Sequence, residues 1–272
     1  MKINTSKDGH MHSEFCPHGT KDKMELYIKE GISKGLYEIS FTEHMPMIDG
    51  FYEDKEFLKE CAPSIEDIEK YFKEVECLKE KYKDELKINI GLEVDYIEGY
   101  EKNTEELLSK YIDLMNDGIL SVHFLKYNNK YYPIDIIENF EELLRVCGSL
   151  EQIYDLYFET VIKSMKADIG KGTLKRIGHP TLIRIFNKKY PIKYENFKLI
   201  NEMIDTMKEK GYECDINTAG LRKEFCGEIY PYKEVFKLVI DKGIDCVLGS
   251  DSHESKDVGF GVEYINKLIE EK

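Results

Sequence analysis

Short apolar segments rich in β-branched and aromatic residues alternate with helical patterns along this 272-residue chain. Most of these segments pass from apolar residues into His, Asp, Glu or Asn at their C-terminal ends, and they cover residues 2–12, 35–45, 86–96, 118–125, 175–183, 212–220 and 244–254. Strands that alternate with helices form right-handed βαβ units, so the pattern predicts a parallel sheet. Because the carboxyl ends of parallel strands meet at one face, we expect the polar residues to gather there.

The clearest helical pattern covers residues 64–83, where apolar side chains recur at spacings of three and four behind the N-cap candidate Ser64. Weaker patterns, the third of them interrupted near Gly148, cover about 22–34, 104–115, 138–166, 194–210, 232–242 and 261–271. Polar residues on every strand favour a closed barrel, because a barrel gathers residues from all its strands at one mouth, whereas an open sheet concentrates its site at one switch point. We therefore predict an α/β barrel in a single domain spanning residues 1–272.

Charge and cysteine content narrow the partners and the compartment. A formal net charge of −14 provides no broad positive field of the kind that nucleic acids require, so a nucleic-acid partner is not expected. A small anionic substrate is compatible with this charge, because metal ions invert the local field.

The seven cysteines are widely spaced and form no C-x-x-C pair, which indicates reduced thiols. With neither an apolar leader nor a stretch of membrane-spanning length, we expect a cytoplasmic protein without a membrane partner; the pattern does not indicate an oligomeric state.

Each of the seven histidines lies where an apolar run gives way to a polar loop: His10, His12, His18, His44, His123, His179 and His253. The first two share one face of an extended segment, because side chains at i and i+2 do so, and Asp251 and His253 repeat this spacing. Imidazole and carboxylate are ligands that Zn, Mn and Fe accept, so we predict a polynuclear metal site at the strand ends. We expect Asp8 to accept a hydrogen bond from a ligand imidazole, and no cysteine to join the ligand set.

Glu93 lies in an otherwise apolar segment, where an unpaired buried carboxylate costs several kcal/mol by order of magnitude. A metal is the predicted partner, and an exposed strand-end glutamate is the alternative. A lone histidine at the position of His44, His123 or His179 is more often a satisfied core residue, and Ser250 with Asp251 could equally cap a following helix. Taken with the two i, i+2 pairs, however, the core interpretation requires independent accidents on successive strands.

Only four of the 39 basic residues are arginines. Where charge alone is needed the chain uses lysine, so an arginine near the strand ends suggests bidentate binding of phosphate. Arg184 and Arg222 are the better candidates, whereas Arg176 precedes its strand's ligand and is expected to face outward. An ordinary surface ion pair is the alternative for each of them.

Motifs along the whole chain, taken together, resemble the polymerase-and-histidinol-phosphatase (PHP) superfamily. They are D-G-H-M-H at 8–12, F-C-P-H-G at 15–19, F-T-E-H at 41–44, G-L-E-V-D at 91–95, S-V-H at 121–123, I-G-H-P at 177–180, I-N-T-A-G-L-R-K at 216–223 and G-S-D-S-H at 249–253. The second of these motifs and N-T-A-G-L-R-K resemble the histidinol-phosphate phosphatase family of histidine biosynthesis.

The resemblance implies a distorted (β/α)7 barrel with up to three metal ions at the C-terminal face of its strands. It also implies three sets of ligands. One metal would bind His10, His12, Glu93 and Asp251; a second would share Glu93 and bind His123 and His179; the third would bind His18, His44 and His253.

The activity that follows is metal-dependent hydrolysis of L-histidinol phosphate to L-histidinol and phosphate, with two or three divalent ions (Zn, Mn or Fe). We expect a hydroxide that bridges two ions to attack phosphorus in line. Arg184 and Arg222 would hold the remaining charge, and Asp251, His253 or metal-bound water would protonate the leaving alkoxide. Residues around Phe15 and Tyr127 to Tyr132 are candidates for selecting the rest of the substrate.

Two other functions are compatible with the same residues. A phosphoesterase of this kind could act on nucleotides or another small phosphate ester, although DNA ends are disfavoured by the negative charge. A protein of a different class, a non-catalytic metal-binding regulator, could keep the ligands for stability. Structural zinc sites are usually closed, four-coordinate and often built with cysteine, so the abundance of carboxylates favours catalysis.

Overall fold

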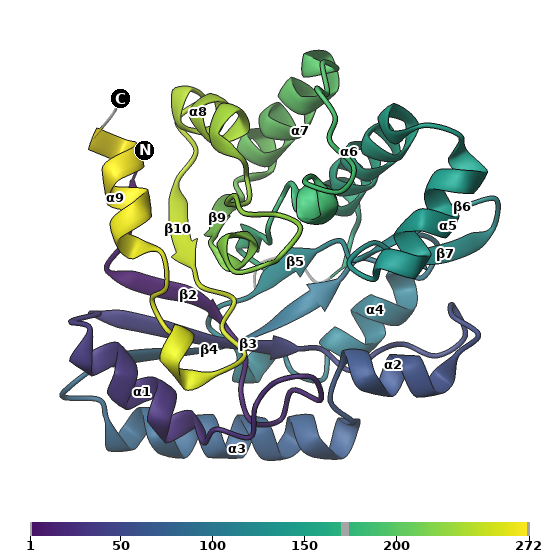
Figure 1. Ribbon diagram of the computed structural model, residues 1–272. Helices are drawn as coiled ribbons and strands as arrows, with labels where there is room; N and C mark the ends of the chain where they lie inside the picture. Colours follow the sequence, from purple (N-terminus) through teal and green to yellow (C-terminus); the bar gives the residue numbers. More distant parts are fainter. Residues whose placement is uncertain (1, 170–173, 271–272) are drawn as a thin grey trace.

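The computed structural model describes residues 2–169 and 174–270, which form a parallel barrel surrounded by helices (Figure 1). Its strands follow the order β1-β10-β9-β8-β5-β4-β3-β2, and every neighbouring pair in that order is parallel. Their bounds are β1 (Ile3–Asn4), β2 (Lys7–Met11), β3 (Glu38–His44), β4 (Lys87–Asp95), β5 (Ile119–Ser121), β8 (Arg176–Ile177), β9 (Glu213–Asn217) and β10 (Cys246–Gly249).

The N-terminal run closes the barrel. Its first part, β1, pairs with β10, and its second part, β2, pairs with β3. Beyond the strands, the backbone N of His12 donates to Ser252 O at 3.0 Å, which continues the seam. Since β1 and β2 occupy one position, the described residues form seven strand positions. The predicted distorted (β/α)7 barrel is confirmed, and a register shift between Asp8 and Met11 is part of the distortion.

A helix lies in each predicted helical segment, although the one expected over 104–115 ends at Leu108, and side-chain caps mark where some of the helices begin. Ser64 Oγ accepts from Asp67 N at the start of α3. Gly148, in the left-handed region at φ 90°, ends α5, and Ser149 caps α6, which is the predicted interruption. The bounds are α1 (Met24–Ser33), α3 (Ile65–Lys81), α4 (Glu101–Leu108), α5 (Ile137–Cys147), α6 (Leu150–Lys166), α7 (Phe197–Lys210), α8 (Lys233–Asp241) and α9 (Val262–Glu270). Residue 271, the predicted end of the last helix, lies outside the described residues.

Shorter pieces were not predicted. Four 3₁₀ turns are described: η1 (Ile112–Leu114), η2 (Leu182–Phe186), η3 (Ala219–Leu221) and η4 (Ser255–Asp257). The predicted strand over 118–125 is wrong in its second half, because the chain leaves the barrel after Ser121 and enters an antiparallel hairpin of β6 (Phe124–Tyr127) and β7 (Lys130–Pro133). In Figure 1 this hairpin and α2 (Lys55–Cys61) lie on the same side of the barrel, at the right.

The hairpin and α2 have a hydrophobic cluster of their own. Its buried members are Ile48, Phe51, Leu58, Ile97, Phe124 and Tyr131, separate from the main core. Phe51 packs edge-on against the rings of Phe124 and Tyr131, with ring centroids 5.1 and 5.4 Å apart. This packing holds α2 and the hairpin, which are additions to the barrel, beside its mouth.

A group of charged residues that we call the basal cluster lies inside the barrel at the amino ends of the strands: Lys7, Asp117 and Arg176. Lys7 Nζ lies 2.7 Å from Asp117 Oδ2, and Arg176 Nη1 lies 2.8 Å from Asp117 Oδ1. Arg176 is 1% exposed, so the expectation that it faces outward is wrong. The buried guanidinium is stabilised because Asp117 neutralises it and Gly9 O accepts from its Nη2 at 2.6 Å.

The sequence also predicted reduced cysteines and no membrane-spanning segment. Each of the seven cysteines is a free thiol. No helix among the described residues is both long and apolar enough to cross a membrane.

Candidate metal centre

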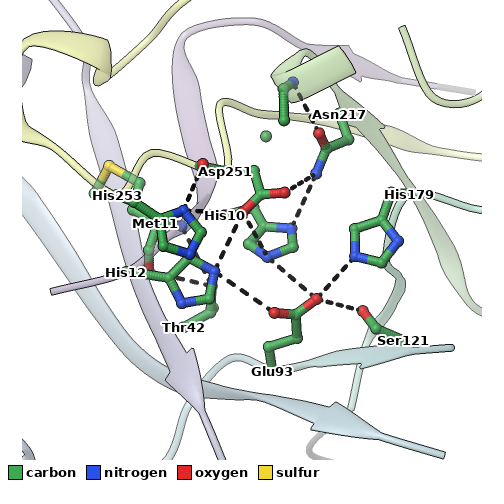
Figure 2. A network of polar contacts seen from close by, with 12 residues as sticks. His10, Met11, His12, Thr42, Glu93, Ser121, His179, Asn217, Asp251 and His253 are labelled. Atoms are coloured by element: carbon green, nitrogen blue, oxygen red, sulfur yellow. Dashed lines mark hydrogen bonds and ion pairs between the residues drawn. The ribbon is translucent and has the colours of Figure 1, made fainter. Parts of the chain in front are cut away.

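The predicted ligands gather at the opposite end of the barrel from the basal cluster. We call them the mouth cluster: His10, His12, His18, His44, Glu93, His123, His179, Asp251 and His253. They lie at or just beyond the carboxyl ends of β2, β3, β4, β5, β8 and β10. Figure 2 shows six of them, His10, His12, Glu93, His179, Asp251 and His253, directed toward one another.

The side chains fall into groups whose ligand atoms lie within 4.8 Å of one another. One group contains His10, His12 and Asp251, and a second contains Glu93, His123 and His179. Glu93 connects them, because its Oε1 lies 3.0 Å from His179 Nε2 and 3.5 Å from His10 Nε2. The structure thus brings together the residues that were assigned to the first two metals.

The third group differs from the expected one. It contains His12, Cys16, His44 and His253, so a cysteine that was not expected among the ligands lies beside them. A turn in which Cys16 N donates to Ser13 O at 3.1 Å returns the buried thiol to the mouth. His18 lies next to this group, with its Nε2 3.0 Å from His253 Nε2, but its side chain is more exposed.

The ring nitrogens of the mouth cluster fit a metal. His10 Nε2, His12 Nε2, His179 Nδ1 and both nitrogens of His44 are buried and have no hydrogen-bond partner. Buried polar atoms without partners are costly, so their convergence requires an explanation. Imidazole nitrogen and carboxylate oxygen are the donors that Zn, Mn and Fe accept, and metal ions would satisfy His10 Nε2, His12 Nε2 and one nitrogen of His44.

Electrostatics divides the mouth cluster in two. Burial lowers the pKa of His12, but the carboxylates of Asp251 and Glu43 outweigh this effect and raise the pKa to about 9. In the same way, Asp95 and Glu93 outweigh burial at His123 and raise its pKa to about 10. Burial, together with His44, lowers the pKa of His18 to about 4. Burial and the neighbouring imidazole of His12 likewise hold the pKa of His253 well below its ordinary value, so His18 and His253 present neutral rings at neutral pH, as metal ligation requires.

The carboxylates carry the opposite shifts. Burial alone would raise the pKa of Glu93 and of Asp251. The histidines around them, His10 above all, hold both pKa values well below the ordinary range. Glu93 and Asp251 are thus anionic and can accept a cation.

Three carboxylates that were not predicted lie behind the imidazoles. Asp215 Oδ2 lies 2.8 Å from His10 Nδ1, and Asp95 Oδ1 lies 2.7 Å from His123 Nδ1. Glu43 Oε1 lies 3.3 Å from His12 Nδ1. Two of the three lie next to a predicted ligand in the sequence: Glu43 directly precedes His44, and Asp95 is two residues after Glu93. This proximity could have identified them.

Asp8 does not support a ligand imidazole, so that prediction is wrong. Its carboxylate accepts from the backbone N of Ser250 at 2.9 Å and of Gly259 at 2.7 Å. The irregularity between Asp8 and Met11 interrupts the alternation on which the prediction depended. Asp8 instead holds the loops that follow β10.

Asp251 does not cap a helix. The next helical turn, η4, begins only at Ser255, and Asp251 Oδ1 lies 3.2 Å from His12 Nε2. Asp251 has φ 52° and His179 has φ 27°, a region that non-glycine residues adopt rarely. Strained backbone of this kind clusters at functional sites.

A cavity of about 680 Å³ opens above the mouth cluster. Basic residues from the segments after β9 and β10 contribute to its lining: Arg222, Lys223 and Lys256. Another part of the lining consists of apolar and acidic residues from α2 and from the two ends of the hairpin: Phe57, Glu60, Phe124, Pro133 and Asp135. The cavity is therefore bordered by both charge signs.

The structure separates the two predicted arginines. Arg222 lines the cavity, donates from Nη2 to Ser250 O at 2.7 Å, and has a buried Nη1 without a partner. Arg184 pairs with Glu228 and stacks over Tyr232 at 4.3 Å, and it is not among the cavity-lining residues.

The residues expected to select the substrate do not line the cavity. Phe15 packs against Tyr71, with ring centroids 6.4 Å apart, and Tyr131 and Tyr132 are buried. Their neighbours Phe124, Pro133 and Asp135 line it instead. Residues of the hairpin and its C-terminal end therefore border the cavity, although the hairpin was not recognised in the sequence.

Comparisons with known proteins agree with this geometry. The PHP domain model matches residues 8–219. A histidinol-phosphatase of Bacillus subtilis is 39% identical over 94% of this chain and 97% of its own length. A probable histidinol-phosphatase of Deinococcus radiodurans is 30% identical over 93% of this chain and 88% of its own.

Solved structures show the same fold. The Listeria monocytogenes protein HisK superposes with a TM-score of 0.89 at 36% identity, covering 95% of this chain and 99% of that protein. The histidinol phosphate phosphatase of Lactococcus lactis, in complex with zinc, L-histidinol and phosphate, superposes with a TM-score of 0.71 at 20% identity, covering 99% and 94%.

Proposed function

Because the chain belongs to the PHP domain family, we propose that its mouth cluster is the active site of a metal-dependent phosphomonoesterase. The protein is a histidinol-phosphatase, which hydrolyses L-histidinol phosphate to L-histidinol and phosphate. The observation that carries the proposal for the site is the convergence of unpartnered ring nitrogens and anionic carboxylates beneath one cavity.

The first metal position would be held by His10, His12, Glu93 and Asp251, and the second by Glu93, His123 and His179. His18, His44 and His253 would hold a third. Divalent ions bound there would lower the pKa of coordinated water and neutralise charge on the phosphoryl oxygens. Zinc, manganese and iron all suit these donors, and the Lactococcus lactis protein binds zinc.

Glu93 is the residue best placed to be shared between two ions. Its two carboxylate oxygens lie 3.5 Å from His10 Nε2 and 3.5 Å from His12 Nε2, and the first oxygen also faces His179. Ser121 Oγ donates to Glu93 Oε1 at 2.6 Å and fixes the orientation of the carboxylate. Glu93 would thus serve both candidate metal positions with one carboxylate.

Arg222 would bind the phosphate. Its Nη2 is held by the backbone oxygen of Ser250 and its Nε lies 3.0 Å from Asp257 Oδ2, so the side chain is fixed while Nη1 has no partner. Arg184 would first have to leave Glu228, so its contribution to phosphate binding is smaller. Asp251 and His253 also line the cavity, where they would lie near the leaving alkoxide. Because Asp251 is anionic, it would have to receive a proton before it could protonate that alkoxide.

The acidic and aromatic part of the cavity would bind the rest of the substrate. The carboxylates of Glu60 and Asp135 line the cavity and take part in no ion pair within the described part of the chain. They lie among Phe57 and Phe124, which offer apolar surface to an imidazole ring. An ester with a phosphate at one end and an ammonium group at the other would match this distribution of charge.

The test is phosphate release by purified protein loaded separately with Mn, Zn or Fe. Substrates would be histidinol phosphate, AMP, phosphotyrosine and an aryl phosphate. We expect strong preference for histidinol phosphate. Hydrolysis directed to AMP would indicate a nucleotidase with the same site, and metal binding without any hydrolysis would indicate a regulatory protein.

A further inference from the structure

Asp215 on β9 is fully buried, although β9 supplies none of the predicted ligands. Its Oδ2 lies within hydrogen-bond distance of three donors. These are His10 Nδ1 at 2.8 Å, Asn217 Nδ2 at 3.1 Å and the backbone N of His179 at 3.3 Å. One carboxylate oxygen thus contacts a residue of β2, a residue of its own strand β9 and a residue just beyond β8.

The contact with His10 determines which ring nitrogen faces the mouth. A carboxylate only accepts, so Nδ1 must carry the hydrogen when it faces Asp215. The lone pair is then on Nε2, which is buried without a hydrogen-bond partner and lies 3.5 Å from Glu93 Oε1. Asp215 therefore presents His10 to a metal in the ligating tautomer.

The other two contacts connect Asp215 to further candidate ligands. The backbone N of His179 is held at a residue whose φ is 27°, which places the imidazole toward Glu93. Asn217 Nδ2 also donates to Asp251 Oδ2 at 3.2 Å. Asp215 thus contacts a member of the first group directly, another through Asn217, and a member of the second group through its backbone.

The neighbouring strand leaves room for this carboxylate. Gly249 on β10 lies beside it, and a Cβ at that position would meet Asp215 Oδ1 at 2.1 Å and His10 Cβ at 2.8 Å. No side chain fits there without moving the carboxylate or the imidazole. Glycine is therefore required by the close approach of Asp215.

We propose that Asp215 is a positioning residue that orients His10 and sets the placement of His10, His179 and Asp251 relative to one another. It would act on two metal positions at once. Asp95, by contrast, contacts one candidate ligand, His123, at a nearly equal distance of 2.7 Å. The inference rests on the proposed function only in that the mouth cluster binds metal.

The experiment compares Asp215→Asn with Asp95→Asn, a matched loss of one carboxylate charge behind one imidazole. Each protein is stripped of metal, titrated with zinc against a chelating indicator, and loaded with cobalt for its visible spectrum. We expect Asp215→Asn to weaken the binding of two ions by roughly 10–100-fold, the usual effect of losing such a carboxylate. Asp95→Asn should weaken one ion, and Gly249→Ala should reproduce the Asp215→Asn pattern.

Melting temperatures of the metal-free proteins separate positioning from general destabilisation. We expect the metal-free Asp215→Asn protein to remain folded, with an altered cobalt spectrum. Wild-type affinity with an unchanged spectrum would overturn the proposal, as would a loss confined to one ion. None of these readouts uses a substrate, so failure of metal-loaded wild-type protein to hydrolyse histidinol phosphate would count against the proposed function and not against the role of Asp215.

Discussion

The barrel buries charged and polar side chains at both of its ends, but the two ends differ in how far these groups are paired. In the basal cluster each charged group has a partner of opposite sign within 2.8 Å: Lys7 and Arg176 on either side of Asp117. Among the described residues, five buried ring nitrogens of the mouth cluster have no hydrogen-bond partner, against one side-chain nitrogen, Arg176 Nε, in the basal cluster. Since unpaired buried polar groups destabilise a fold, the comparison indicates that the basal cluster serves stability and the mouth cluster is arranged for a ligand.

The largest effect that tests this comparison is expected for Glu93→Ala. The change removes the carboxylate that faces His10, His12 and His179. We expect metal content and phosphate release to be lost together, by more than the roughly 100-fold of an outer carboxylate. Metal analysis and the phosphate assay check this, and turnover retained in the variant would contradict the two-metal arrangement.

Asp117→Asn tests the other end of the barrel. The substitution removes the carboxylate between Lys7 and Arg176. Glu38 still lies 3.0 Å from Lys7, but the nearest remaining carboxylate to Arg176, that of Glu213, is 3.6 Å away and partly exposed, so we expect the free energy of unfolding to fall by about 3 kcal/mol. Urea denaturation measures the loss. Zinc affinity of the folded variant should match that of the wild type, and a parallel loss of zinc would show that the two clusters are coupled.

Arg222→Ala and Arg184→Ala compare the two predicted arginines. Because Arg222 lines the cavity with Nη1 free, we expect kcat/KM to fall by about 100-fold, as for loss of one charge-stabilising donor. Arg184 is paired with Glu228, so its removal should cost less than about tenfold. Steady-state kinetics decides between them, and equal losses would mean that Arg184 reaches the phosphate during turnover.

Asp135→Asn examines the acidic wall of the cavity. We expect KM for histidinol phosphate to rise by about tenfold, the effect of one charge-assisted hydrogen bond of roughly 1.4 kcal/mol, while hydrolysis of an aryl phosphate without an ammonium group is unchanged. The ratio of the two substrates is the measurement. An equal effect on both would place Asp135 outside the binding site.

The smallest effect concerns pH and the metal-free protein. The raised pKa values of His12 and His123, about 9 and about 10, contribute stability that is present below the unfolded value of about 6.5 and is lost as pH rises toward 9 and 10. The lowered pKa of His18, about 4, acts in the opposite direction and removes stability as pH falls from about 6.5 toward 4.

The melting temperature of the metal-free protein should therefore be highest near pH 6.5, with changes of a few degrees on either side. Thermal unfolding in a chelator across this range checks the prediction. Metal-loaded protein should not show the decline on the alkaline side, because metal occupies the nitrogens that would otherwise bind protons.

Much of the fold and of the ligand set could be predicted because it depends on local pattern. Spacing of apolar residues marks each strand and helix, and the ends of parallel strands must meet. The pattern therefore predicted that polar residues gather at one face, and the family resemblance implied the grouping of His10 and His12 with Glu93 and Asp251. Asp8 and Arg176 were placed wrongly for a common reason: the orientation of a side chain in a strand depends on register and on irregularities that spacing does not report.

Periodicity and the chemistry of each side chain are enough to predict the seven strand positions, the helices between them and the residue types at the mouth. Which side chains become partners depends on how the barrel closes. The tertiary structure placed Asp215 behind His10, Cys16 beside His44, and Asp135 at the wall of the cavity. Asp215 and His10 are far apart along the chain, as are Cys16 and His44, and Asp135 follows a hairpin that was not predicted. Only the closed barrel brings these residues to its mouth.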